Sequence, residues 1–175
     1  MQYFCTKFIL NMKKYFYFLS LLLLLVSCTE EVRFNNPAFQ TLKDNVFWRG
    51  QVYSAGIETN GFFIVEGSLG YEQIKFQIPE PVEKTYVLGV DDDIKAVYKN
   101  TYKGEEAEFT TGTGKGSGEI VVTEYNTDDN TISGTFKFTA VNTSSDAEKQ
   151  TMHFSEGVFY KIPIESGANF VPVDN

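Results

Sequence analysis

The clearest chemistry in the sequence belongs to a cysteine thiol. Cys28 follows Leu25-Val26-Ser27, with a branched residue three positions before it and a small one beside it. Ahead of these lie the cationic Met12-Lys13-Lys14 and an apolar stretch, 15–26, that is shorter than the roughly 20 residues of a spanning helix. This order is typical of a lipoprotein signal peptide, in which the thiol receives diacylglycerol. We therefore expect a leader over 1–27, with Met12 as the true start, and a lipidated Cys28; ordinary secretion or an uncleaved anchor is the alternative.

Nucleophilic and zinc chemistry lack the residues they need. The other cysteine, Cys5, lies in the expected leader, so the mature chain has no internal disulfide and no thiol site. His153 is the only histidine, and one imidazole without cysteine ligands cannot hold zinc. No Gly-x-Ser-x-Gly elbow accompanies it, because the nearest trio is Gly116-Ser117-Gly118. His153 is expected to be an ordinary strand residue.

The glycine-rich run 111–118 contains one lysine and invites comparison with a phosphate loop. A phosphate loop requires Gly-Lys followed by Ser or Thr, but Lys115 precedes Gly116, and Phe109 stands where the first glycine belongs. The run therefore predicts an inter-strand loop. No cofactor is expected.

Acidic residues offer two weak possibilities. Asp91, Asp93 and Asp128 could supply calcium oxygens if their two turns met at one end of a sheet, but neither turn has the spaced calcium-loop pattern, and aspartate is common in turns for its backbone hydrogen bonds. No metal is therefore assigned. Glu105, Glu106 and Glu108 could form the paired carboxylates of a glycoside hydrolase, although a solvated strand edge explains them equally.

Aromatic rings are the remaining binding material, with 10 tyrosines and 16 phenylalanines. Tyr53 and Tyr125 fall off the apolar face of their expected strands, where rings can stack on a sugar. They are the ligand-binding candidates, against a background of aromatics that pack across strands anyway.

The charge of the chain excludes some partners. The formal charge is −8, and removal of Lys7, Lys13 and Lys14 lowers the basic count from 15 to 12 against 23 acidic residues, which gives −11. Such a protein is repelled by nucleic acid and by anionic lipid surfaces. Membrane attachment is therefore expected through acyl chains on Cys28.

The elements that must position these residues are strands. Period-two alternation and turn signals predict nine of them, over 46–53, 62–66, 71–78, 84–90, 95–100, 105–110, 119–125, 131–141 and 151–164. Asn60-Gly61 favours a type I′ hairpin, Gly157 a bulge, and Ile132, Gly134, Phe136, Phe138 and Ala140 should share one buried face. No helical period extends over three turns after Cys28. The fold class is all-β, a single antiparallel β-sandwich or flattened β-barrel of about eight to nine strands, and the pattern leaves both open.

The domain organisation follows from these elements. We expect a lipidated tether over 28–44, one β domain over 45–165 and a loose C-terminal tail over 166–175. Glu30-Glu31 after the cysteine resemble a surface-export signal of Bacteroidetes lipoproteins, although they also suit a solvated linker. Thr29 in place of aspartate favours the outer membrane.

A resemblance covers most of the domain. The stretch 120–140, which includes Ile132-Ser133-Gly134-Thr135-Phe136, and then Glu156-Gly157-Val158-Phe159 resemble the C-terminal hairpin of an uncharacterised β-rich lipoprotein family of Bacteroidetes. Tyr86-Val87-Leu88-Gly89 extends the likeness, which runs from about 47 to 164. That family is a domain of unknown function without assigned catalytic residues, so the resemblance implies fold and location and no chemistry.

The functional expectation is a lipid-anchored outer-membrane or cell-surface lipoprotein that is not an enzyme. It would act as a binding or interaction module for a glycan or an envelope protein. Two alternatives stay open: a carrier of a small apolar ligand in a barrel cavity, and a small hydrolase with paired carboxylates. The sequence leaves open the identity of the partner, the side of the outer membrane and the oligomeric state.

Overall fold

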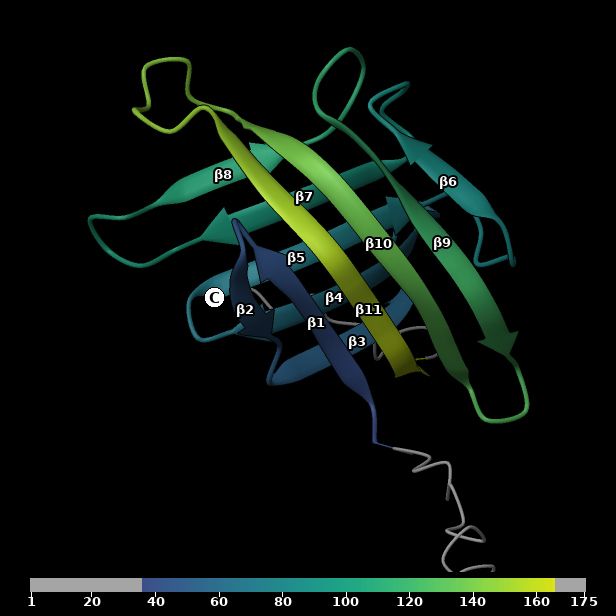
Figure 1. The fold of residues 1–175 in the computed structure, drawn as a ribbon. Coiled ribbons are helices and arrows are strands. Elements are labelled where there is room, and N and C mark those ends of the chain that lie inside the picture. Colours follow the sequence, from purple (N-terminus) through teal and green to yellow (C-terminus); the bar gives the residue numbers. More distant parts are fainter. Residues whose placement is uncertain (1–35, 166–175) are drawn as a thin grey trace, which may run out of the picture. The chain divides into compact units, whose positions relative to one another are not determined.

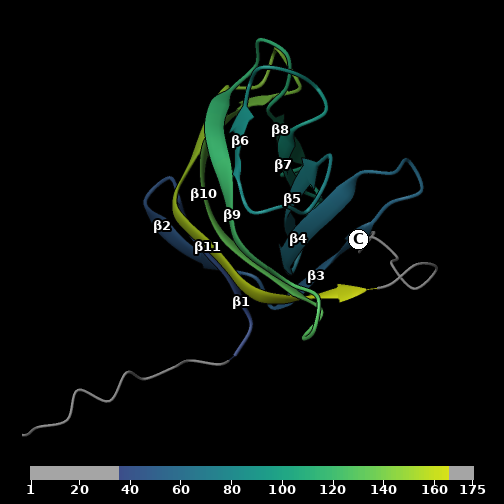
Figure 2. The ribbon, with the colours of Figure 1, turned by 90° about the vertical axis from the view of Figure 1, so that its right-hand side faces the viewer.

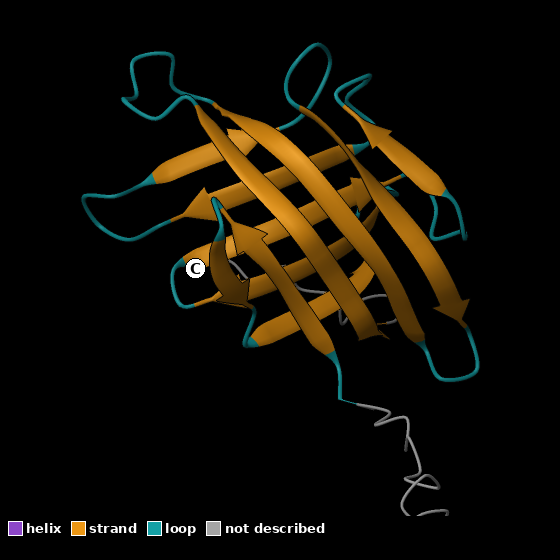
Figure 3. Cartoon of the chain, in the orientation of Figure 1, coloured by secondary structure: helices purple, strands orange, loops and turns teal. Residues whose placement is uncertain are grey.

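The computed structural model describes residues 36–165, and within them the chain forms eleven strands and no helix (Figure 3). The strands are β1 (Ala38–Lys43), β2 (Val46–Arg49), β3 (Val52–Ile57), β4 (Phe63–Leu69), β5 (Glu72–Ile78), β6 (Thr85–Leu88), β7 (Lys95–Asn100), β8 (Ala107–Thr110), β9 (Ser117–Asn126), β10 (Thr131–Asn142) and β11 (Thr151–Glu165). The all-β prediction is confirmed. No segment of this described part is a helix long and apolar enough to cross a bilayer.

The strands form one sheet that closes on itself. Their order is β2-β1-β11-β3-β4-β5-β7-β8-β10-β9-β6, and β11 also pairs with β10. The ring β11-β3-β4-β5-β7-β8-β10 is therefore closed, and the other four strands extend its front layer. Figure 1 shows β6, β9, β10, β11, β1 and β2 crossing in front of the layer of β3, β4, β5, β7 and β8. The structure thus decides for a flattened barrel.

Two bulges in β11 make this closure possible. The register of β11 against β10 shifts on either side of Phe159, and the residues with positive φ at these shifts are Glu156 (52°) and Lys161 (47°). A bulge bends its strand and increases the twist. After the second bulge β11 pairs with β10 as far as Pro163, and Ile164 and Glu165 then pair with Ala55 and Gly56 of β3, the one parallel strand pairing of the sheet described here. The bulge expected at Gly157 is confirmed, and its residue with positive φ is the preceding Glu156.

The strand count of eight to nine was too low. β1 lies within the stretch expected as tether, where a short segment between Pro37 and Asp44 gave little alternation to read. Gly50 splits the expected strand 46–53 into β2 and β3. The expected apolar face was wrong: Trp48 is buried, whereas Val52 lies beyond the break and is exposed, and Val46 is exposed at the start of β2.

The turns differ from expectation in an informative way. In the β3–β4 hairpin only Gly61 has positive φ, and its N–H donates to the carbonyl of Glu58 at 2.9 Å. The loop 59–61 is thus a three-residue connection and the type I′ prediction was wrong. The two positive φ values of a type I′ turn occur instead at Asp44 and Asn45 between β1 and β2.

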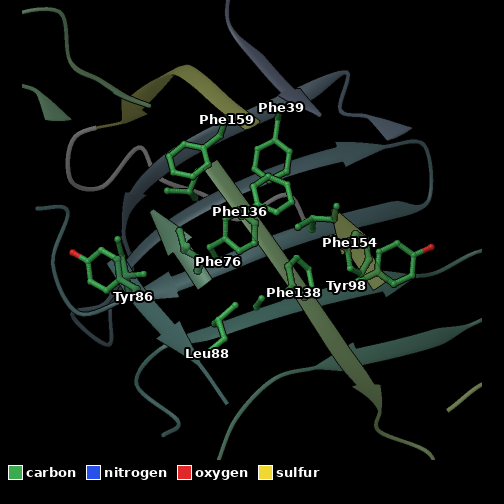
Figure 4. Close-up of a cluster of buried hydrophobic side chains, with 14 of the residues drawn as sticks. Phe39, Phe76, Tyr86, Leu88, Tyr98, Phe136, Phe138, Phe154 and Phe159 are labelled. Carbon is green, nitrogen blue, oxygen red and sulfur yellow. The ribbon is translucent and has the colours of Figure 1, made fainter. Parts of the chain in front are cut away.

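The core lies between the two layers and is largely aromatic. Phe39, Phe76, Phe136, Phe138 and Phe154 meet there, with ring centroids 4.3 Å apart for Phe138–Phe154 and 4.6 Å for Phe76–Phe136 (Figure 4). The inward face predicted for β10 is confirmed, since its Ile, Gly, Phe, Phe and Ala residues are all buried. Rings therefore fill the space that a hollow barrel would leave open.

Candidate functional site

Two exposed tyrosines meet at one end of the barrel. Tyr71 lies in the β4–β5 turn and Tyr102 in the β7–β8 loop, with 58% and 49% of their surfaces exposed. Their ring centroids are 5.2 Å apart and the rings are inclined by 53°. We call this pair the tyrosine platform. Because each ring is exposed yet placed by a turn, the pair offers an aromatic surface to a ligand at little cost in side-chain entropy.

Backbone hydrogen bonds fix the platform. The N–H of Thr101 donates to the carbonyl of Tyr71 at 2.9 Å, and the Thr101 hydroxyl donates to the same oxygen at 3.3 Å. The N–H of Tyr102 donates to Asn100 Oδ1 at 3.0 Å. Thr101 thereby joins the two turns that carry the rings.

A polar groove of about 450 Å³ begins at the same threonine. It runs between the β7–β8 hairpin and the loop after β10, and its lining is Lys99, Asn100, Thr101, Glu106, Ala107, Glu108, Asn142, Thr143, Ser144 and Ala147. Both the N–H and the hydroxyl of Thr143 donate to the carbonyl of Glu108, at 2.9 and 3.2 Å, which holds the loop against β8. The groove presents amide, carboxylate, hydroxyl and ammonium groups beside the platform.

A partly buried hydrogen-bond network begins at the residue that follows Tyr71. Glu72, next to Tyr71, accepts hydrogen bonds from Lys43, from the Tyr98 hydroxyl and from Trp48 Nε1, the last at 2.9 Å. Partial burial acts to raise the pKa of Glu72, but the hydrogen bonds from Lys43, Tyr98 and Trp48 outweigh it and hold the pKa below its ordinary value. Burial, and then the Glu72 carboxylate, raise the pKa of Tyr98 well above its usual range. The network ties β1 and β2 of the front layer to β5 and β7 behind.

The tyrosines proposed from the sequence lie elsewhere. Tyr53 and Tyr125 are half-buried and pack against the core, and Tyr125 meets Phe63 edge-on at 6.3 Å. Their expected position off the apolar face was therefore wrong. Tyr53 pairs with Gly67 at one end of β4 whereas Tyr125 contacts Phe63 at the other, so the structure does not bring the two together.

Sequence reasoning missed the platform because it looked for rings within strands. A signal was available: Tyr71 directly follows Gly70, and Tyr102 precedes Lys103-Gly104. A tyrosine beside a turn glycine is expected to be exposed, since turns lie on the surface.

The aspartates considered for calcium are also kept apart. Asp91 follows β6, whose Leu88 pairs with Gly118 at the start of β9, while Asp128 follows the end of β9 at Asn126. About 26 Å of strand separates these two ends, at roughly 3.3 Å per residue. Asp91 Oδ1 accepts from the N–H groups of Asp93 and Ile94, both at 3.0 Å, which is turn chemistry. Among residues 36–165 no three His, Cys, Asp or Glu side chains are grouped as a metal site.

His153 and the glycine run have structural surroundings. His153 lies on β11, and its ring nitrogen Nδ1 is 2.9 Å from the Thr139 hydroxyl. The backbone N–H of His153 donates to Asp44 Oδ1 at 2.9 Å. The glycine run connects β8 to β9, and a β-carbon at Gly116 would come within 2.4 Å of the Thr139 carbonyl oxygen at a φ of +65°. Close approach to β10 therefore accounts for glycine there.

Two of the three glutamates considered for hydrolysis line the groove. Glu106 and Glu108 stand two apart on the same face at β8, both exposed, and Glu106 Oε2 accepts from the N–H of Gly104 at 2.8 Å. A general acid at a glycosidic bond depends on a desolvated pocket. These exposed carboxylates instead suit hydrogen bonds to a bound ligand.

The barrel matches one known family. The model of the domain of unknown function DUF6252 matches residues 35–163, nearly the whole of the barrel. The chain belongs to this family. No curated protein and no solved structure matches it. For this DUF6252 domain, the start of the match at 35 agrees with a fold that includes β1.

Proposed function

We propose that this DUF6252 domain is a non-catalytic glycan-binding module, which a lipid on Cys28 holds in the outer membrane or at the surface of a Bacteroidetes cell. The observation that carries the proposal is the tyrosine platform, two rings 5.2 Å apart and about half exposed, beside a polar groove. Exposed aromatic pairs that are not covered by other side chains of their own domain are suited to ligands with flat apolar faces. A sugar ring has such a face, and its edge carries hydroxyl groups.

The groove supplies the partners for those hydroxyl groups. Asn100 carries an amide, and Glu106 and Glu108 are acceptors of the kind that sugar hydroxyls donate to. A small number of placed polar groups around an apolar contact is the usual construction of a small-molecule site. The same lining, with a single lysine against two glutamates, suits a neutral glycan better than an anionic one.

The placement of the groove fits an anchored protein. The chain enters the barrel at Ala38, which pairs with Tyr160, whereas the groove includes the loop before Thr151 at the opposite end of β11 (Figure 1). Nine residues of strand, roughly 30 Å, separate the two ends. A domain held through the segment before Ala38 would direct the groove away from the membrane.

The two alternatives have less support. A carrier of an apolar ligand needs an apolar cavity, but the space between the layers holds packed rings such as Phe76, Phe136 and Phe138. A hydrolase needs a desolvated acid, which Glu106 and Glu108 at an open groove do not provide.

Affinity electrophoresis through gels that contain neutral polysaccharides (a xylan, a mannan, a glucan) or an acidic one (a polygalacturonate), followed by calorimetry with the matching oligosaccharide, tests the proposal. Tyr71→Ala and Tyr102→Ala should each weaken binding about tenfold, or ~1.4 kcal/mol, because each removes one face of the platform. Tyr102→Phe keeps the ring and should retain most of the affinity. Val87→Ala, at an exposed site on β6, is the control for surface change.

The proposal fails if no polysaccharide retards the protein, or if retardation survives in the Tyr71→Ala/Tyr102→Ala double variant. In the second case the ligand would bind elsewhere. If the ligand is an envelope protein, no polysaccharide should retard the domain, and a cross-linker placed at position 71 or 102 should capture that protein in whole cells.

A further inference from the structure

The back strand β4 is buried on both faces, although strands pack on only one of them. Phe63 and Val65 point inward and belong to the core. Ile64, Glu66 and Ser68 alternate with them and point outward, yet they are 0%, 1% and 4% exposed. Figure 2 views the two layers edge-on, with the described strands of the front layer on the inner side of β4 only. Something besides the strands of residues 36–165 must cover the outer face.

Local side chains do not explain the burial. On the outer face Ile64 has Gly56 of β3 on one side, which offers no side chain, and Gln77 of β5 on the other. The ion pair of Glu58 and Lys75 crosses nearby, with 18% and 27% of the two side chains exposed. An isoleucine between a glycine and a glutamine on an open sheet would expose much of its side chain. The cover must therefore be a chain segment with apolar residues.

The outer face also has a polar part that would suit an extended segment. Glu66 accepts from the Ser54 hydroxyl at 3.1 Å and from Gln73 Nε2 at 3.2 Å. Beside it a hollow of about 270 Å³ is lined by Glu66, Gln73, Lys75, Gln77, Lys95, Val97 and Lys99. Lys75 and Lys95 of this hollow pair with Glu58 and Asp92, so Lys99 is the lysine of the lining that a negatively charged group of an occupant would suit.

We propose that the segment 166–175 of the same chain docks on this outer face. β11 ends at Glu165, which pairs with Gly56, and Gly56 pairs with Ile64. The segment therefore starts two strands, about 10 Å, from Ile64. Its ten residues reach up to roughly 33 Å when extended, enough to cross β4, β5 and β7.

The composition of the segment matches the face. Phe170, Val171 and Val173 supply apolar side chains for Ile64, and Asp174 supplies a negative charge for Lys99 at the hollow. The segment before Ala38 is the poorer occupant, because Ala38 belongs to β1 in the front layer, beyond β11. This docking needs no ligand at the tyrosine platform and stands apart from the glycan proposal.

Thiol labelling tests the docking directly. In the full chain with Cys5→Ser and Cys28→Ser, no other cysteine competes. An Ile64→Cys thiol should react slowly with a maleimide in this chain, and at least about tenfold faster when the chain ends at Glu165, because local exposure governs the rate. Ile57→Cys, exposed on β3, should react fast at both lengths, and Ile74→Cys, in the core, slowly at both.

A synthetic peptide of residues 166–175, added to the shortened chain, should slow Ile64→Cys again. If the core thiol of Ile74→Cys also reacts faster in the shortened chain, the full-length Phe170→Asp variant takes the place of the shortened chain. In that variant the labelling of Ile64→Cys must become faster while that of Ile74→Cys stays slow. Slow labelling at position 64 in the shortened and the Phe170→Asp chains would mean another occupant, such as a second copy, and would overturn the proposal. Fast labelling in the full chain would overturn it too, since the face would then be open.

Discussion

The ring of Phe159 lies on Gly134, so close that a β-carbon at Gly134 would stand 2.3 Å from Phe159 Cζ. The relationship is reciprocal along the β10–β11 pair, because a β-carbon at Gly157 would stand 2.4 Å from the ring of Phe136. Both glycines and both rings belong to the two motifs by which the sequence resembles its family. The motifs are thus a packing device that joins the two longest strands described.

Gly134→Ala should destabilise the barrel strongly. The new methyl group would meet Phe159 and, at 2.2 Å, the carbonyl oxygen of Val121, so either the ring or β9 must move. We expect a loss of about 1–3 kcal/mol or more in the free energy of unfolding, measured by urea denaturation. Thr135→Ala, at the exposed neighbour, should stay within about 0.5 kcal/mol. Equal stability of the two variants would contradict the packing described.

Ser133→Ala tests the second bulge. The Ser133 hydroxyl, which is buried, accepts the N–H of Lys161 at 3.1 Å and lies 3.3 Å from Glu124 Oε2. Loss of this acceptor inside the bulge should cost about 1–3 kcal/mol. Hydrogen exchange should show faster exchange at the Lys161 amide, with the amides of β4 unchanged. A variant that leaves the Lys161 amide as protected as before would show that the serine does not hold the bulge.

Glu72→Gln should make stability less dependent on acid. The pKa of Glu72 lies below its ordinary 4.5 in the folded chain, so the unfolded chain takes up this proton first as the pH falls. The stabilisation is therefore present above about pH 4.5 and is lost as the pH falls below that value through the folded pKa. At pH 7 we expect Glu72→Gln to cost about 1–3 kcal/mol, because it weakens charge-assisted hydrogen bonds from Lys43, Tyr98 and Trp48.

Thermal melts of both proteins from pH 7 to pH 3 give the readout. The difference between the wild-type chain and Glu72→Gln should shrink below about pH 4.5. A difference that stays constant over this range would mean that the carboxylate charge does not stabilise the network.

Calcium should leave the protein unchanged. Asp91 and Asp128 lie at opposite ends of β9, so their turns cannot share an ion. Millimolar calcium chloride, compared with a chelator, should shift Tm by no more than about 1 °C, because an ion that bound only the folded state would raise it. A clear rise would require a calcium site that these turns do not form.

Lipidation is tested at the cysteine itself. Cys28→Ser should abolish incorporation of an alkyne fatty acid and move the protein from the membrane fraction to the soluble fraction or leave its leader uncleaved, whereas Cys5→Ser should change neither. Replacement of Glu30 and Glu31 by alanine should, if they are an export signal, reduce protease shaving of intact cells while lipidation continues. Unmodified Cys28 in the native protein would remove the basis of the location proposed here.

The sequence by itself determined the strands with strong alternation, the bulge beside Gly157 and the inward face of β10. Period two is a local property, and burial of one face reads directly from it. The same local view missed β1, whose six residues alternate weakly. It also misjudged Val52, which the break at Gly50 separates from the strand of Trp48, and Val46, which is exposed at the start of that strand.

Only the tertiary structure decided between sandwich and barrel, because closure depends on the pairing of Ile164 with Ala55, residues more than a hundred positions apart. The same holds for the candidate site. Tyr71 and Tyr102 come from separate turns, and the pairing of β5 with β7 brings them together. Long-range register is set by the sum of many cross-strand contacts, and no single segment of sequence carries it.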